Sequence, residues 1–134
     1  METRTTLPFS DGDKEFWLPM PRVVAAEREI EGSIFALFYD IAENLGSAMG
    51  ELVLVGATEV RLKSCHAVIR NALVGGGTGE QEARDLVATY CYPARPAMRD
   101  VALAYNVLKA AIYGIELAPD AKKKPEATAD LMRS

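Results

Sequence analysis

The chain has 134 residues and a formal net charge of −4, and 49% of its residues are hydrophobic. This length favours a single domain with a sizeable core, and the composition is typical of a soluble globular protein. The acidic balance argues against a nucleic-acid-binding protein, which normally carries a basic face for phosphate groups. The sequence has no apolar run of about 18 residues and no apolar N-terminal leader, so we expect a cytoplasmic protein without a membrane segment.

The first predicted element is a β-hairpin within residues 3–18. Two short apolar runs flank Asp11-Gly12, a dipeptide typical of two-residue hairpin turns. A turn centred there pairs Leu7 with Phe16. Because side chains alternate along a strand, four apolar residues share one face: Leu7, Phe9, Phe16 and Leu18. Trp17 is expected on the other face, and the apolar face is expected to pack on the helices.

Two helices are predicted next. The first runs over residues 22–31 and ends at Gly32, and Ser33 is expected to cap the second. The apolar residues of the second helix recur at intervals of three and four, which places them on one stripe: Ile34, Leu37, Phe38, Ile41 and Leu45. Phe35 and Tyr39 widen this stripe beyond what a surface helix needs.

Three more helices are predicted in the second half, after residues 51–55, which are expected to be extended or a brief strand. A third helix is expected from a Thr58 cap to the glycines 75–77. A fourth follows from Gly79 to Cys91, with Thr78 and Gln81 as a capping box. The fifth spans residues 96–113, and its expected inward residues are Met98, Val101, Ala102, Tyr105, Leu108 and Ile112.

These elements predict an α+β fold that is mainly α. Residues 1–118 are expected to form one domain, in which an N-terminal hairpin is followed by about five helices in a compact bundle. Residues 119–134 are small, charged and without pattern, so we expect a flexible tail there.

The sequence predicts no catalytic, cofactor-binding or metal-binding residues. His66 is the only histidine, and it is expected at the surface or at the edge of the core. Its helical neighbour Cys65 points about 100° away, too far for a nucleophile–base pair. The run 75–79 lacks the preceding strand and the lysine of a phosphate-binding loop. Cys65 and Cys91 fit no metal or redox spacing and are interpreted as buried thiols, with a disulfide as the alternative.

Three aromatic residues are candidates for binding a partner: Trp17, Phe35 and Tyr39. Each falls outside the apolar stripe or face of its own element, and aromatic residues are enriched at protein interfaces. The alternative is that they cover the core between the hairpin and the helices.

In order and spacing, several segments resemble the tail assembly chaperones of gene transfer agents and siphophage-like elements, small proteins sometimes described as tail tube components. The matching segments are Phe16-Trp17-Leu18, Glu29, residues 34–37, 68–77 and 82–87, Arg95-Pro96 and residues 111–114. The resemblance implies a protein without enzymatic activity or cofactor, whose partners are the tape measure protein and the tail tube protein. It also implies that the protein acts in the cytoplasm of a bacterial host and is absent from the mature particle.

Two other functions stay open at this point. A structural virion component, such as a tail tube, adaptor or neck subunit, would remain in the particle. A small DNA-associated helical protein is opposed by the acidic balance of the chain. The sequence also leaves open whether the chain forms a homo-oligomer.

Overall fold

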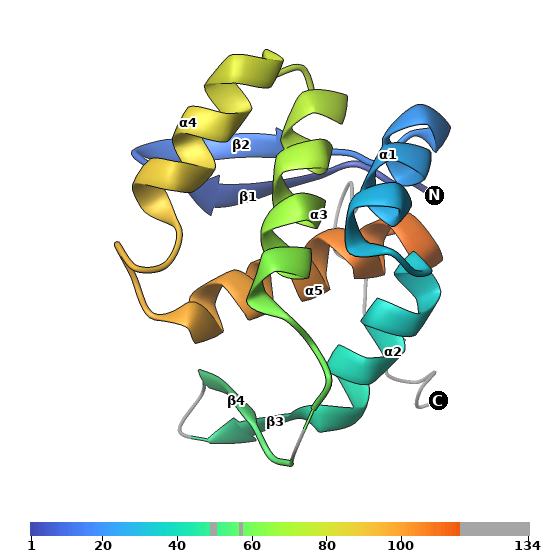
Figure 1. Ribbon diagram of the computed structural model, residues 1–134, viewed down its shortest axis with the longest axis vertical. Coiled ribbons are helices and arrows are strands. Elements are labelled where there is room, and N and C mark those ends of the chain that lie inside the picture. The colour runs from blue at the N-terminus through green and yellow to red at the C-terminus, as the bar shows by residue number, and fades with distance from the viewer. Residues whose placement is uncertain (49–50, 57, 116–134) are drawn as a thin grey trace, which may run out of the picture.

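A computed structural model describes residues 1–48, 51–56 and 58–115 (Figure 1). Its elements in chain order are β1 (Thr5–Phe9), β2 (Gly12–Phe16), α1 (Met20–Ile30), α2 (Ile34–Asn44), β3 (Leu45–Ala48), β4 (Glu51–Leu54), α3 (Leu62–Gly75), α4 (Glu80–Tyr90) and α5 (Ala97–Tyr113). The predicted fold class, α+β and mainly α with an N-terminal hairpin and five helices, is confirmed. The predicted tail, 119–134, lies outside the described residues, as do residues 116–118 of the predicted domain. None of the helices that the structure describes is long and apolar enough to cross a membrane.

Helix α3 lies at the centre of the fold and contacts α1, α4, α5 and strand β2 (Figure 1). Half of its residues are buried: Cys65, Ala67, Val68, Ile69, Asn71, Ala72 and Leu73. A helix that is buried on several sides needs a packing neighbour on each side, and these four elements supply the neighbours of α3. Helix α2 lies further out and packs mainly on α5.

The register of the first hairpin differs from the prediction by two residues. The turn is Ser10-Asp11 instead of Asp11-Gly12, so Leu7 pairs with Lys14 and not with Phe16. Ser10 adopts φ 60°, and two-residue hairpin turns need a positive φ at this position. The alternation of side chains fits both registers equally, so it could not choose between them. The predicted apolar face is confirmed, because its members are buried or pack on the core: Leu7, Phe9, Phe16 and Leu18.

The glycines that end α3 allow this helix to approach the hairpin closely. A Cβ atom on Gly75 would collide with the carbonyl oxygen of Trp17, and one on Gly76 would collide with that of Glu15. The backbone N–H of Trp17 also donates to the carbonyl of Ala72, at 3.0 Å. The residue after them, Gly77, has φ 118° and turns the chain toward α4.

Two predicted helix caps are wrong. Thr78 does not cap α4, whose N-cap is Gly79; its backbone N–H instead donates to the carbonyl of Leu73 and so belongs to the end of α3. Helix α3 begins later than predicted, with Arg61 at its N-cap. The hydroxyl of Thr58 accepts a hydrogen bond from the N–H of Val60 in the turn before it.

A second hairpin follows α2. The predicted Ser33 cap is confirmed, since its hydroxyl accepts from the N–H groups of Phe35 and Ala36. The helix ends at Asn44, one residue earlier than predicted, because Leu45 is extended and starts β3. Strand β3 pairs antiparallel with β4, which confirms an extended run near residues 51–55. The pairing itself was not predicted.

The predicted inward face of α5 is partly wrong: only Val101 and Leu108 of its six residues are buried, and Ala102 is only partly buried. The buried face is rotated toward Leu103 and Val107 because both α3 and α2 pack against α5. Its buried residues are Asp100, Val101, Leu103, Ala104, Val107, Leu108 and Ala110. The predicted Met98, Tyr105 and Ile112 are only partly buried, at the border of this face. After α5, Ile115 exchanges two backbone hydrogen bonds with Glu2, of 2.7 and 2.9 Å.

Candidate functional site

Three exposed aromatic side chains lie together on α2 and the end of α5. Phe35 and Tyr39 are 55% and 48% exposed and stand one helical turn apart on the outer side of α2. Tyr113 is 54% exposed, and its hydroxyl lies 3.0 Å from that of Tyr39. These three residues are named the aromatic face. Contiguous exposed aromatic surface is typical of a protein-binding site.

A buried aromatic cluster supports the aromatic face from within. The ring of Phe38 meets those of Tyr39 and Tyr113 edge-on, at centroid distances of 5.4 and 5.8 Å. Its other neighbour is Tyr105, which stacks on it at 5.4 Å with an interplanar angle of 7°. Packed aromatic rings have few alternative positions. Tyr39 and Tyr113 are therefore ordered before any partner arrives, which lowers the entropy lost on binding.

The pair of hydroxyl groups joins the two helices at the surface. The hydrogen bond with Tyr39, followed by burial and the neighbouring phenols, raises the pKa of Tyr113 above its ordinary value. Tyr113 is therefore neutral at physiological pH. It presents an apolar ring and a neutral polar edge, a combination that suits a binding surface.

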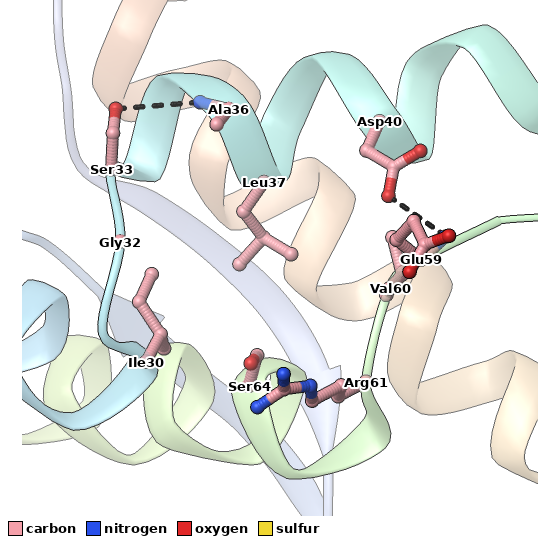
Figure 2. A pocket seen from close by; sticks show the side chains of 10 residues that line it. All are labelled: Ile30, Gly32, Ser33, Ala36, Leu37, Asp40, Glu59, Val60, Arg61 and Ser64. Atoms are coloured by element: carbon pink, nitrogen blue, oxygen red, sulfur yellow. Dashed lines mark hydrogen bonds between the residues drawn. The ribbon is translucent and has the colours of Figure 1, made fainter.

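A pocket of about 210 Å³ opens on the neighbouring side of α2 (Figure 2). Figure 2 shows Ile30 and Leu37 pointing into the space between α2 and the start of α3. Asp40 stands at the rim, where its carboxylate accepts from the N–H of Glu59 at 3.1 Å. The other lining residues are Gly32, Ser33, Ala36, Val60, Arg61 and Ser64. Ala36 lies between the pocket and Phe35, so the pocket and the aromatic face adjoin.

Trp17 lies elsewhere, next to the N-terminal residues. It is half-buried, its indole N–H donates to the hydroxyl of Thr3 at 2.9 Å, and the guanidinium of Arg4 lies 4.1 Å from its ring centroid. The structure brings Phe35 and Tyr39 together but leaves Trp17 outside the aromatic face. A partner-binding role for these three residues stays a prediction.

A second group of polar side chains is buried between α3 and α5 around Asp100. Its carboxylate has no exposed surface and accepts three hydrogen bonds, from His66 Nε2 (2.8 Å), the backbone N–H of Tyr92 (2.8 Å) and Arg95 Nε (2.9 Å). Burial alone would raise the pKa of Asp100. The three hydrogen bonds and the charge of Arg95 outweigh that effect and leave its pKa below the ordinary value.

Ligand atoms of His66, Cys91 and Asp100 all lie within 4.8 Å of one another, the kind of group that can hold a metal ion. The chemistry of the donors opposes this role. Burial and the charge of Asp100 raise the pKa of Cys91 to about 12, so this thiol stays protonated and is a poor ligand. Both oxygens of Asp100 are occupied, and Arg95 places a positive charge where a cation would bind. The cluster is better explained as an internal tie between α3 and α5.

The sequence predicted His66 at the surface or at the edge of the core, and it did not predict the carboxylate partner, 34 residues further along the chain. The predicted inward residues of α5 place Asp100 on the other side of that helix, so its burial could not be predicted from the helical spacing. Cys65 and Cys91 are free and buried, as predicted.

Comparisons of the chain with protein-family models, with curated proteins and with solved structures give no match.

Proposed function

We propose that this protein is a non-enzymatic tail assembly chaperone of a phage or gene transfer agent. In this role it binds the tape measure protein, keeps that chain soluble, and helps the tail tube protein to assemble around it. The observation that carries the proposal is the aromatic face, in which the exposed Phe35, Tyr39 and Tyr113 lie together on α2 and the end of α5. The resemblance described above supplies the identity of the partners.

The chemistry of the aromatic face suits a partner with apolar helical stripes. A flat patch carried by two helices can receive the apolar side of a third helix, a recognition mode in which residues one turn apart act as anchors. Tyrosine and phenylalanine offer large contact areas with few rotatable bonds. Three such residues suit modest, reversible binding, as is needed for a chaperone that the tube protein displaces.

The alternative function is a structural component of the particle, such as a tail tube, adaptor or neck subunit. The described strands form two separate two-stranded hairpins. A tube subunit is expected to join its neighbours through continuous sheets, so this architecture favours the chaperone over the tube subunit.

Co-expression tests the proposal. The full chain, carrying an affinity tag, is produced together with the tape measure protein encoded in the same genetic element. We expect the tape measure protein to move from the insoluble to the soluble fraction and to co-purify with the chain. A tape measure protein that stays insoluble and unbound would contradict the proposal. Mass spectrometry of purified particles distinguishes the chaperone from a structural component, since only a structural component would be present in stoichiometric amounts.

Substitution of the aromatic face links the test to the structure. Phe35→Ser combined with Tyr39→Ser removes two anchors, and we expect recovery of the complex to fall at least about tenfold, since such anchors each contribute about 1 kcal/mol or more. The matched control is Val24→Ser, which changes an apolar residue that is 45% exposed on α1. Val24→Ser should unfold within about 0.5 kcal/mol of the parent, because exposed positions carry little stability. The double variant also loses the edge-on contact of Tyr39 with Phe38, which costs about 0.5–1.5 kcal/mol, so its folding is verified by urea unfolding before binding is compared.

A further inference from the structure

All of the net negative charge of the chain comes from one segment, residues 29–60. It holds six carboxylates and no lysine, arginine or histidine, whereas the whole chain has a net charge of −4. The remaining residues therefore sum to +2. The six carboxylates are Glu29, Glu31, Asp40, Glu43, Glu51 and Glu59. This segment includes α2 and thus two of the three residues of the aromatic face.

The carboxylates of α2 follow the aromatic face along the helix. Glu43 is exposed and lies one turn beyond Tyr39, which itself lies one turn beyond Phe35, so the three form a continuous row. Asp40 stands on the adjacent side, toward the pocket. Next to Asp40 is the exposed Glu59, held there because its N–H donates to the Asp40 carboxylate.

The pocket combines this negative rim with an apolar floor. Ile30, Leu37 and Val60 line its interior, and Asp40 and Glu59 stand at its edge (Figure 2). A long basic side chain matches this arrangement, because its methylene groups bury against apolar surface while its charged end reaches carboxylates. The volume of about 210 Å³ is ample for one such side chain.

Two cations also face this region and reduce its negative charge. Arg61 lines the pocket, and the exposed Lys109 lies on α5 in the same row as Tyr105 and Tyr113. Three carboxylates oppose these two cations: Asp40 and Glu59 line the pocket, and Glu43 continues the row of Phe35 and Tyr39. The surface that surrounds the aromatic face is therefore net negative.

From this arrangement we infer that the aromatic face and its pocket recognise a basic amphipathic helix. The apolar stripe of that helix lies on Phe35, Tyr39 and Tyr113, and lysine or arginine beside the stripe meets Glu43, Asp40 and Glu59. The inference deepens the proposed function, because it names the kind of tape measure segment that the chaperone binds. It rests on that function only for the identity of the partner, since the charge and shape belong to this chain.

Two synthetic helical peptides test the inference. They carry the same leucine stripe, but one has lysine and the other glutamate at every flanking position. Binding to the full chain is followed by fluorescence anisotropy at 50 and 500 mM salt. We expect the lysine peptide to bind at least about tenfold more tightly at low salt and to lose most of this advantage at high salt, because exposed charge pairs are screened.

Matched charge variants tie the effect to this surface. Glu43→Gln with Glu59→Gln removes two carboxylates beside the aromatic face, and we expect the lysine peptide to bind about fivefold more weakly. Asp13→Asn with Glu82→Gln removes two exposed carboxylates elsewhere and should leave binding unchanged. Equal affinity for the two peptides, or an equal loss in both double variants, would overturn the inference.

Other results separate the inference from the proposed function. If the tape measure protein is recovered but its binding depends neither on salt nor on Glu43 and Glu59, the inference fails and the chaperone role stands. If the lysine peptide binds but the tape measure protein does not, the basic-helix site stands and the proposed function fails. Self-association in the ultracentrifuge that is abolished by Phe35→Ser would assign the face to a second copy of this chain and overturn the inference.

Discussion

Asp100 is a charged side chain with no exposed surface, whereas Phe35 and Tyr39 are aromatic side chains of which about half is exposed, 55% and 48%. Both reverse the usual placement of their residue type. The Asp100 carboxylate is stabilised inside the protein by three hydrogen-bond donors, one of which carries a positive charge. For the outer surfaces of Phe35 and Tyr39 the described residues offer no comparable cover. A buried polar group with all its partners holds the fold together, and an apolar surface without cover is available to another molecule.

The largest expected effect comes from Asp100→Ala. The substitution leaves Arg95 and His66 without their carboxylate in a largely buried site, and breaking a buried ion pair in this way costs roughly 3–5 kcal/mol. Urea unfolding measures the loss. The control, Asp13→Asn, changes an exposed carboxylate and should stay within about 0.5 kcal/mol of the parent. A loss below about 1 kcal/mol would mean that Asp100 does not tie α3 to α5.

A smaller effect is expected where the end of α3 meets the hairpin. Gly75→Ala places a methyl group against the carbonyl of Trp17, and overpacking of this kind costs about 1–3 kcal/mol. Gly12→Ala is the matched control, because a Cβ atom there has no neighbour within 4 Å; it should be neutral or stabilising by up to about 1 kcal/mol. Equal stability of the two variants would show that the close approach is not needed.

The pH dependence of stability follows from the lowered pKa of Asp100. An unfolded aspartate has a pKa of about 3.9. Between that value and the lower folded one, the unfolded chain binds more protons, so stability falls as the pH is lowered through this window. Above it the contribution is fully present. Glu29 adds the same trend. Burial raises its pKa, but hydrogen bonds from Arg70 and Asn71 outweigh burial and leave the pKa below the ordinary value. In Asp100→Asn the acid-induced loss, measured by urea unfolding from pH 2 to 7, should be shallower.

The smallest effect is expected at the aromatic face. Tyr113→Phe removes one hydroxyl from an exposed pair, and stability should change by about 0.5 kcal/mol or less. The hydrogen bond to Tyr39 is the largest cause of the raised pKa of Tyr113. In the Tyr113→Phe variant, the ultraviolet titration curve of the tyrosines should therefore lack the transition that the parent protein shows at the highest pH. If that transition persists, the hydroxyl pair does not form in solution.

Periodicity and chain breakers predicted the existence and approximate bounds of the helices, because each helix ends near glycine or proline. The α2 stripe of Ile34, Leu37 and Ile41 is buried as expected, and Ser33 begins that helix. The start of β3 was missed because Leu45 also continues the helical spacing of α2. The local pattern fits both states there, and only the pairing with β4 decides.

The sites depend on contacts between distant residues, and the sequence could predict them only in part. Phe35 and Tyr39 were recognisable because they exceed the needs of their helix. Tyr113 was not, since its place beside Tyr39 requires the packing of α2 on α5. The partnership of His66 with Asp100 likewise depends on how α3 crosses α5. Spacing along one helix carries no information about either pair.

The exchange of hydrogen bonds between Glu2 and Ile115 brings the first residues of the chain beside the end of α5. Because residue 115 lies this close to the first residues, a chain shortened to residues 1–115 is suitable for circular permutation. A short linker could join residue 115 to residue 1, and the chain could be opened at the exposed Gly77. The hairpin would then continue from α5, and both new ends would lie at the turn between α3 and α4. A fluorophore or surface anchor attached there would leave Tyr113 and its neighbours free for single-molecule work.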